Sequence, residues 1–258
     1  MVRADPDPAQ VADAKVRARI AATALPWLVR HRQTGIELLL VPPGEYLMGS
    51  MASELERPVH RVKLTRPFYV SRCEVTQGEW SKVMATNPSK FQGDPDLPVE
   101  QVSFDDLNKG GGFLKQTGLR LPTEGEWEYV AHGLNETKYP WGDNDDPDCM
   151  NCGSSGKDGK ALDQTAKVGS HPKGVAWCGA LDLAGNVWEW CSDGYDATSY
   201  NSRVQPVVDP TGPANATMRV IRGGAWNYSS KDARCSNRGK LAPSDRFSYV
   251  GFRVVKVP

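Results

Sequence analysis

Glycine and proline interrupt this sequence so often that they leave little room for long helices. From Ile36 onward, short runs rich in β-branched and aromatic residues alternate with Gly and Pro turns, as in IELLLVP, EYLMG, HRVKLT and FYVSRCEVT. The 25 glycines and 19 prolines among 258 residues favour a loop-rich chain over a helical bundle. Eight tryptophans and 39% hydrophobic residues still supply enough apolar material for one substantial core.

Helices are expected at three places between these breaks. The first covers Asp7–Leu25, because its first residue is a good N-cap, a proline follows it and apolar residues recur at helical spacing. The second begins near Thr76, and the third follows Thr123, which has a glutamate at the capping-box position. We therefore divide the chain into an N-terminal helical extension, residues 1–35, and one domain, residues 36–258.

The charge balance and the cysteine content limit the possible partners and compartments. The 31 basic residues equal the 31 acidic ones, so no long-range field toward nucleic acid or an anionic membrane is expected. No run approaches the roughly 18 apolar residues of a membrane span, and Asp5 and Asp7 stand where a signal peptide would be basic. Six cysteines are too sparse for a disulfide scaffold. We expect a cytoplasmic protein with no nucleic acid or membrane partner.

One motif, DLAGNVWEW, offers the oxygen atoms that calcium prefers. Asp182 and Glu189 are carboxylates around a tight glycine turn, and the backbone carbonyls of Gly185 and Val187 could complete an oxygen cage. The segment 133–173 is irregular and rich in Gly, Asp and Asn, and bound metal is a common means of fixing such a segment. The alternative is that the aspartate caps a turn while the two tryptophans of the motif fill the core.

Eight motifs occur in an order that resembles one known family. They are VPPGEYLMGS, RPVHRVKLTRPFYVSRCEVTQGEW, LPVEQVSFDD, GLRLPTEGEWEYVAHG, YPWGDN, LDLAGNVWEW, RVIRGGAW and GFRVV. Together they resemble the sulfatase-modifying factor, or formylglycine-generating enzyme, family over about residues 36 to 256. The resemblance implies a variant of the C-type lectin fold, which is a loop-rich α+β domain with small sheets and two main helices.

The resemblance also implies bound calcium with a structural role. The oxygens of the DLAGNVWEW motif correspond to one calcium site of the family. A second family site uses an asparagine that is matched here by Asn151. Its acidic partner is either Asp158 or Asp163, and neither matches securely.

The enzymes of this family oxidise a substrate cysteine with two cysteines, five positions apart, that bind copper. A Cu(I) ion needs soft, ionisable sulfur ligands. Here the first position falls at Tyr228, the second falls within 229–233 where no cysteine stands, and Cys235 matches a later, non-catalytic family cysteine. The sequence therefore lacks the copper site and favours a non-catalytic protein. The alternative is a formylglycine-generating-type oxidoreductase with an altered metal site.

The C-terminal segment resembles the variable proteins of diversity-generating retroelements. These proteins share the lectin-like fold, and a segment that ends in a GFR strand is rewritten in them at adenine-containing codons. In this sequence, clusters of aromatic, hydroxyl and small residues alternate with the frame RGGAW, DARCSNR, PSDR and VGFRVV. Tyr and Ser provide adaptable contacts at low entropy cost, as in paratopes. Such loops on a rigid frame predict a recognition surface.

We expect this surface to bind a protein or another macromolecule, without predicting the oligomeric state. The aromatic anchors of such a surface usually dominate its binding energy, and here they are Trp226, Tyr228, Phe247 and Tyr249. The complete expected set is Trp226, Asn227, Tyr228, Ser229, Ser230, Lys231, Gly239, Lys240, Leu241, Ala242, Phe247, Ser248 and Tyr249. The alternative is an ordinary solvated loop.

Three arginines of the frame leave two possibilities open. Arg222, Arg246 and Arg253 could clamp an anionic ligand, because a guanidinium binds anions in a bidentate manner. We favour the other possibility, in which they pair with Asp232 or Asp245 and fix the loops.

Overall fold

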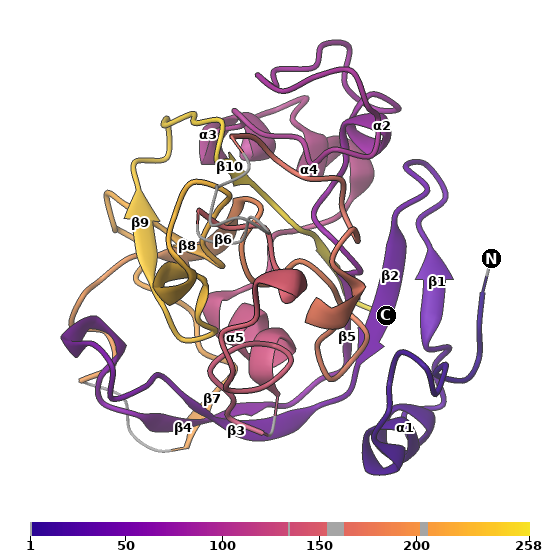
Figure 1. Cartoon of the computed structure of the whole chain (residues 1–258), viewed down its shortest axis with the longest axis vertical. Coiled ribbons are helices and arrows are strands. Elements are labelled where there is room, and N and C mark those ends of the chain that lie inside the picture. Colours follow the sequence, from indigo (N-terminus) through magenta and orange to yellow (C-terminus); the bar gives the residue numbers. More distant parts are fainter. Residues whose placement is uncertain (1, 134, 154–162, 202–205) are drawn as a thin grey trace.

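Three small β-sheets carry the fold of the computed structural model, which describes residues 2–133, 135–153, 163–201 and 206–258 (Figure 1). Their strand orders are β1-β2-β5-β11, β10-β6-β8-β9 and β3-β4-β7. The strands are β1 (Leu28–Arg30), β2 (Glu37–Val41), β3 (Gly44–Met48), β4 (His60–Leu64), β5 (Phe68–Ser71), β6 (Trp188–Gly194), β7 (Val207–Val208), β8 (Arg219–Arg222), β9 (Gly239–Leu241), β10 (Val250–Gly251) and β11 (Val255–Lys256).

Short helices connect and cover these sheets. They are α1 (Ala14–Ala21), α2 (Gln77–Trp80), α3 (Phe104–Asn108), α4 (Phe113–Thr117), α5 (Glu124–His132) and the 3₁₀ helices η1 (Glu54–Glu56), η2 (Pro147–Cys149), η3 (Pro172–Gly174) and η4 (Ser230–Ala233). In the part of the chain that the structure describes, none of them combines the length and apolar character needed to cross a bilayer. Loops account for much of the remainder, and the expected α+β architecture is confirmed.

Local sequence signals explain several elements directly. Strand β4 alternates buried and exposed residues along its length, which is the period of a strand with one solvated face. Strand β5 is buried at every position, so both of its faces are covered, and it pairs with β2 and β11 along its two edges. The expected capping box at Thr123 is present, and this residue precedes α5 and accepts a hydrogen bond from the Glu126 amide at 3.1 Å. A second capping box, at Thr76, precedes α2.

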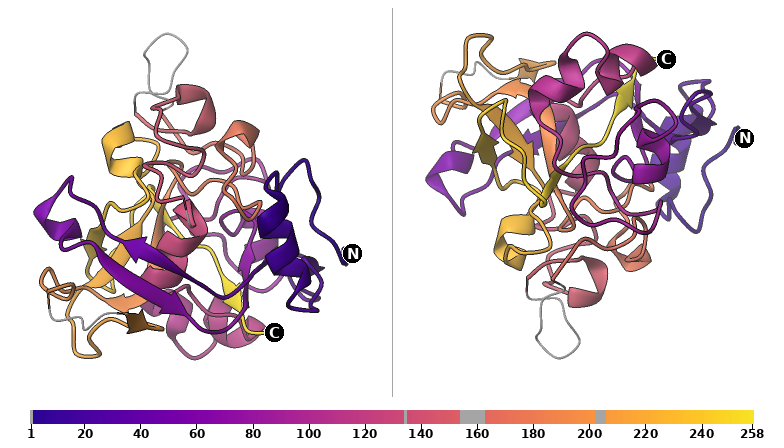
Figure 2. Two further views of the ribbon diagram at one scale, coloured as in Figure 1. Left: turned by 90° about the horizontal axis from the view of Figure 1, so that it is seen from below. Right: turned by 90° about the horizontal axis from the view of Figure 1, so that it is seen from above.

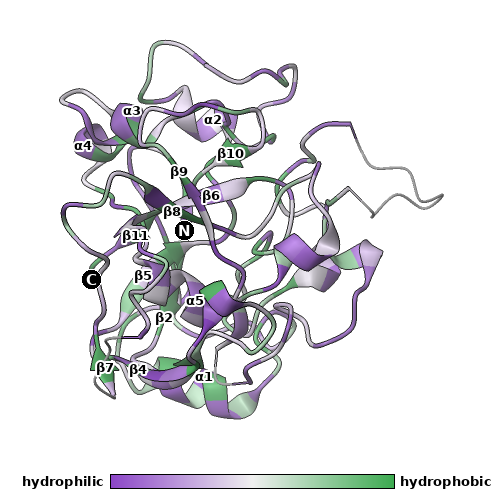
Figure 3. Cartoon of the chain, turned by 90° about the vertical axis from the view of Figure 1, so that its left-hand side faces the viewer, coloured by the Kyte–Doolittle hydropathy of each residue, from purple (hydrophilic) through white to green (hydrophobic). Residues whose placement is uncertain are grey.

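Helix α1 is shorter than expected, so the prediction of a helix over Asp7–Leu25 is wrong at both ends. Its N-cap is Asp13, whose side chain accepts a hydrogen bond from the Lys15 amide at 2.7 Å. The Asp7 carbonyl instead closes a separate turn with the Val11 amide. Asp7 and Asp13 are both suitable N-caps for this helix, and Asp13 is the one that caps it. Figure 3 shows hydrophobic and hydrophilic residues on α1, as its one buried face requires.

The N-terminal extension packs into the same core as the sheets. Val16 and Ile20 of α1 belong to one hydrophobic cluster with strands β2 and β5, and Trp27 is fully buried. Strand β1 pairs antiparallel with β2, so the first sheet includes residues upstream of position 36. Figure 2 shows α1 along one flank of the molecule. The extension therefore adds to the core rather than extending away from it.

Buried ion pairs tie α5 to the second sheet. Arg222 of β8 bonds to Glu128 of α5, and both side chains are fully buried. Its guanidinium also lies 5.3 Å from the ring centroid of Trp127. Burial alone would raise the pKa of Glu128, but the Arg222 charge and a hydrogen bond from His132 lower it to about 2. Arg238 makes a second such pair with Glu124 at 2.6 Å. These two ion pairs fix the frame of the C-terminal segment against α5.

Candidate ligand-binding site

Four aromatic rings form a continuous row that begins on the surface of the C-terminal segment; we call it the aromatic row. Phe247 stacks on Tyr249 with ring centroids 4.9 Å apart. Tyr249 contacts Tyr228 at 5.4 Å, and Tyr228 contacts Trp188 at 5.5 Å. Phe247 is 36% exposed whereas Trp188 is only 4% exposed. The row therefore runs from the surface into the core, and its tip offers apolar contact area to a partner.

Trp226, the remaining expected anchor, lies beside the same loop. Its Nε1 donates a hydrogen bond to the Ser248 carbonyl at 3.1 Å, and its ring meets Phe91 edge-on at 5.5 Å. The Lys90 ammonium lies 5.0 Å from the Phe91 ring centroid. All four expected anchors therefore lie in one region. Sequence reasoning missed Phe91, since it belongs to a distant loop.

The backbone beneath the row is fixed by hydrogen bonds to three other segments of the chain. The Trp188 and Gln101 amides donate to the carbonyls of Tyr249 and Phe247, respectively. The Gly153 amide donates to the Tyr228 carbonyl at 2.6 Å. The Trp226 amide donates to the Asn186 carbonyl at 2.9 Å. Side chains can therefore vary at the tip without loss of these bonds, because every bond uses backbone atoms only.

Two residues of the expected surface contribute no side chain to it. Ser230 is buried in η4 and donates to Asp145. Gly239 belongs to β9, where an added Cβ would lie 2.7 Å from the Ile221 side chain. Lys240, the next residue of β9, is exposed, and its ammonium lies 4.9 Å from the ring centroid of Tyr195.

The other expected residues remain accessible. Three of them, Asn227, Ser229 and Lys231, are exposed. The half-buried members are Leu241, Ala242 and Ser248.

The three frame arginines pair with carboxylates, but not with the expected ones. Arg222 pairs with Glu128, Arg246 with Asp106 at 2.7 Å, and Arg253 with Glu189 at 2.6 Å. Asp232 instead completes the capping box of η4, and Asp245 accepts a hydrogen bond from the Ala242 amide. The expected partners are wrong, because an aspartate close in sequence is consumed by its own turn.

A buried glutamate fixes the loop that carries Phe91. The Oε1 atom of Glu100 accepts a hydrogen bond from the Phe91 amide at 2.9 Å, while Oε2 is buried with no hydrogen-bond partner. Burial raises the pKa of Glu100 to about 7, although the hydrogen bond from the Phe91 amide opposes the shift. This side chain therefore titrates near neutral pH.

The expected calcium ligands of the DLAGNVWEW motif lie at the base of β6. Glu189 accepts two hydrogen bonds from Arg253, at 2.6 and 2.7 Å, and one from the Trp127 Nε1 atom at 2.6 Å. The Asp182 Oδ2 atom accepts from the Gly169 amide at 2.6 Å. Burial raises the pKa of both carboxyl groups. Gly185 adopts a positive φ of 83°, as the tight turn requires.

Asn151 lies next to this turn and contributes an unpaired oxygen. Its carbonyl accepts from the Asn186 amide at 2.7 Å, and its Nδ2 donates to the Asn186 side chain at 3.2 Å. The Oδ1 atom of Asn151 and the Oγ1 atom of Thr165 are both buried without a hydrogen-bond partner. Asp163 is exposed, and Asp158 lies outside the described residues. The donor set is thus rich in oxygen, which suits a hard cation.

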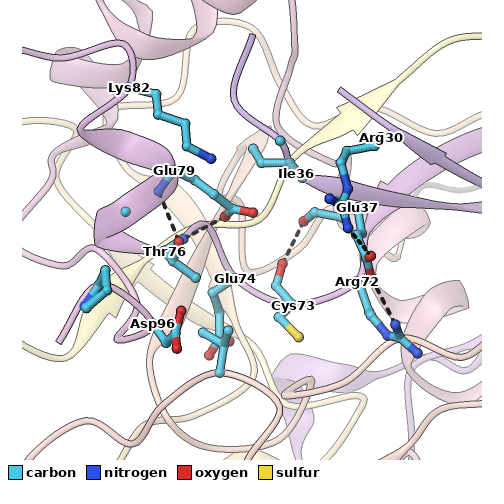
Figure 4. Close-up of a pocket in the computed structure, with 15 residues that line it drawn as sticks. Arg30, Ile36, Glu37, Arg72, Cys73, Glu74, Thr76, Glu79, Lys82 and Asp96 are labelled. Carbon is cyan, nitrogen blue, oxygen red and sulfur yellow. Dashed lines mark hydrogen bonds and ion pairs between the residues drawn. The ribbon is translucent and has the colours of Figure 1, made fainter. Parts of the chain in front are cut away.

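A third carboxylate, Glu74, lies close to these residues in the wall of a pocket (Figure 4). Sequence reasoning missed it. Burial raises the pKa of Glu74 well above its ordinary value, and the charges of Asp182 and Glu189 raise it further. The pocket has a volume of about 490 Å³ and is also lined by Cys73, Glu79 and other residues labelled in Figure 4. Within the described residues, no three His, Cys, Asp or Glu side chains form a ready metal cluster.

The cysteines of the described residues are all free thiols. Cys235, the residue nearest to the copper positions of the family, is fully buried. Burial raises the pKa of its thiol well above the ordinary value, and the nearby Glu128 charge adds to this shift. Tyr228, which the sequence resemblance matches to the first copper position, packs between two aromatic rings. This region therefore presents rings and hydroxyls, and its thiol is kept protonated.

Small sheets, long loops and the aromatic row together define a loop-rich α+β domain of the C-type lectin-like kind. The sulfatase-modifying factor enzyme 1-like domain matches residues 28–258, and the chain belongs to this family. The fold that the sequence resemblance implied is thereby confirmed.

Solved structures of two related proteins have the same fold. "Treponema denticola variable protein 1" is 25% identical with a TM-score of 0.74, over 90% of this chain and 98% of its own. PvdO from Pseudomonas aeruginosa is 27% identical with a TM-score of 0.75, over 88% of this chain and 97% of its own.

Curated relatives include both enzymes and larger proteins. The formylglycine-generating enzyme of Streptomyces coelicolor is 30% identical, over 87% of this chain and 90% of its own length. The protein named serine/threonine-protein kinase pkn1 of Chlamydia caviae is also 30% identical, over 85% of this chain. This chain spans only 38% of the length of that relative.

We predict that Glu100→Gln stabilises the protein at pH 8 but not at pH 4. The folded-state pKa of about 7 lies above the ordinary value of 4.5, so folding is penalised increasingly as pH rises through this window. Removal of the charge should recover at most about 3 kcal/mol at pH 8, and nothing at pH 4 where the carboxyl is protonated in both states. Urea unfolding at both pH values measures the difference. An equal loss of stability at both values would contradict the prediction.

Proposed function

We propose that this protein is a non-catalytic binding protein that recognises a protein or another macromolecule through the tip of the aromatic row. One observation carries the proposal: adaptable side chains stand on a backbone that is hydrogen-bonded to other segments of the chain. A paratope combines rigid aromatic anchors with adaptable polar residues. The tip has the same combination, since exposed polar residues such as Asn227 and Ser229 lie beside the rings. Presentation on a fixed frame lowers the entropy cost of binding.

The chemistry at the tip supports binding over oxidation. The oxygen-activating copper ion of the enzymes needs thiolates. Tyr228 stands at the first copper position, and the Cys235 thiol is buried beside an anionic glutamate that disfavours its ionisation. We therefore infer that the family scaffold is used here for recognition.

We further propose that this protein is of the diversity-generating retroelement type. Its similarity to Treponema denticola variable protein 1 supports this proposal, as does the mixture of Asn, Tyr, Ser, Phe and Ala at the tip. We place it in the cytoplasm, where buried free thiols such as these remain reduced.

The gene should show the signature of this diversification. Near the gene we expect a reverse-transcriptase gene and an imperfect copy of the codons for residues 219–254 that differs from them mainly at adenines. Sequencing of the locus is the measurement, with the codons for residues 36–71 as an internal control that has no such copy. Absence of both features removes the retroelement proposal. Copper-dependent oxygen consumption with a cysteine peptide would overturn the binding proposal itself.

Substitutions at the tip should be tolerated, whereas substitutions in the frame should not. We predict that Phe247→Ser and Asn227→Ser change the free energy of unfolding by less than about 1 kcal/mol, because both residues are exposed. Arg253→Met should cost about 3–5 kcal/mol, since it leaves Glu189 buried without its partner. Urea denaturation of the three variants tests the contrast. Equal losses would show that the tip is part of the core and not a recognition surface.

Calcium is the second component of the proposal. We propose that Asp182 and Glu189, with the carbonyls of Gly185 and Val187, hold a structural Ca²⁺, and that Asn151 contributes to a second calcium site beside it. The unpaired Asn151 oxygen and the oxygen-rich donor set support this assignment. Such an ion would fix the turn whose Asn186 carbonyl binds the Trp226 amide. It would thereby stabilise the base of the recognition surface.

Chelation should therefore lower the melting temperature. A ligand bound only by the folded state adds about 2.7 kcal/mol at a concentration of a hundred times its Kd. We expect EDTA to lower the melting temperature of the wild-type protein by several degrees and excess Ca²⁺ to restore it, as measured by calorimetry. Mg²⁺ at the same concentration is the control and should restore less, because it demands a stricter octahedral geometry. A melting temperature that does not respond to EDTA would contradict the calcium assignment.

A further inference from the structure

One face of the first sheet carries a pocket to which all four strands contribute a residue. Val29 of β1 is opposite Leu38 of β2. Leu40, two residues further along β2, is opposite Tyr69 of β5, which is in turn opposite Lys256 of β11. Opposed and alternate residues of antiparallel strands share a face of the sheet. The pocket has a volume of about 500 Å³, and it is lined by Leu25, Val29, Arg30, His31, Arg32, Leu38, Tyr69, Lys256 and Pro258.

The floor of this pocket is apolar. Leu38 and Tyr69 are buried, and the half-buried Leu25 and Val29 pack against the main core. The Tyr69 hydroxyl donates a hydrogen bond to the Pro26 carbonyl at 2.8 Å, so the fold already uses the polar end of this side chain. The floor therefore offers aliphatic groups and an aromatic ring to a ligand, as most small-molecule sites do.

The rim of the pocket is basic, and we call this cavity the basic pocket. None of the described residues that line it has a carboxylate side chain. Arg30 is paired with Glu37 at 2.8 Å, but the same carboxylate also accepts from Arg72 at 2.9 Å. Arg32 and Lys256 are exposed, and no salt bridge joins either one to a carboxylate within the described chain. Positive charge therefore exceeds negative charge at the rim, and a concave surface concentrates its field.

His31 lies in the wall between the floor and this charge. Its Nδ1 atom is 2.9 Å from the Thr34 hydroxyl, so the fold fixes the orientation of the ring. Burial lowers the pKa of His31, and the positive charge of Lys256 lowers it further. The field of the rim thus reaches into the pocket, where a bound anion would oppose it.

We infer that the basic pocket is a second binding site, which takes a small organic carboxylate with an apolar chain or ring. The carboxylate lies at the rim, where Arg32 and Lys256 supply charged hydrogen-bond donors. The apolar part lies on the floor formed by Val29, Leu38 and Tyr69. This site is independent of the aromatic row and of the proposed calcium ligands, because none of its lining residues belongs to either.

Sodium octanoate is the probe for this site, and related compounds separate the role of its charge from that of its chain. By titration calorimetry, we expect the wild-type protein to bind octanoate at least about tenfold more tightly than octylammonium, which has the same chain and the opposite charge. Each methylene removed between octanoate and butanoate should weaken the Kd about two- to fourfold. Equal affinity for octylammonium, or for acetate, would overturn the inference.

Two glutamine variants test the rim. Arg32 and Lys256 are exposed, so Arg32→Gln and Lys256→Gln should leave the fold intact. We expect each variant to weaken the Kd for octanoate about threefold or more, and the double variant about tenfold. Lys109→Gln is the matched control, since this exposed lysine follows α3, which Figure 1 shows away from β1. Its Kd should change by less than about twofold, because salt screens distant charges. Wild-type affinity in the double variant would overturn the assignment.

His31 provides a readout inside the pocket. Saturation with octanoate should raise the pKa of His31, because a nearby anion favours the protonated imidazole. An NMR titration of the histidine resonances with and without octanoate measures this change. Octanoate that binds without affecting His31 occupies another place and overturns the assignment. A protein that binds anionic phosphatidylglycerol vesicles but no octanoate has a membrane-binding surface instead, and this result would also overturn the inference.

Discussion

The ion pair between Arg253 and Glu189 is the interaction on which the rest of the structure depends. Both side chains are fully buried, and two hydrogen bonds of 2.6 and 2.7 Å join them. Trp127 of α5 donates a third bond to the same carboxylate. A single carboxylate thus connects the C-terminal segment, the central helix and β6. A buried charge without its partner is strongly unfavourable. Removal of any one of these partners therefore leaves a buried group unpaired and destabilises the fold.

The first two residues of β6, Trp188 and Glu189, point to opposite faces of the strand and have different surroundings. On one face, Glu189 lies near two further carboxyl groups, those of Glu74 and Asp182. On the other, Trp188 begins a row of rings that ends at the exposed Phe247. The Asn186 turn connects the two, because its side chain contacts Glu74 while its carbonyl holds the Trp226 amide. A cation bound by Asp182 and Glu189 would therefore stabilise the backbone of the recognition surface without contacting the ligand of that surface.

Much of the fold follows from local sequence signals, whereas much of the site does not. The helix starts predicted near Thr76 and after Thr123 are those of α2 and α5, and the strand-like run HRVKLT predicted β4. Helix α1 was misplaced because two aspartates offered the same cap, and β9 was taken for a loop because Gly-Lys-Leu carries no pattern of its own. Its strand conformation comes from pairing with β8, which is a tertiary effect. The same limit applies to Phe91 and Glu74, since only the folded chain brings these residues to the sites.

The frame and the tip differ in how freely their residues can be substituted. The carbonyls of Phe247, Tyr249 and Tyr228 and the amide of Trp226 are all bound by other backbone groups, so the side chains at 227 and 247 take no part in these bonds. Gly239 is different, because any Cβ there would meet Ile221 at 2.7 Å. A mechanism that rewrites residues freely is therefore compatible with the exposed positions and incompatible with the glycine. Whether a position tolerates substitution depends on the atoms within van der Waals distance of its Cβ, and not on where the residue lies in the segment.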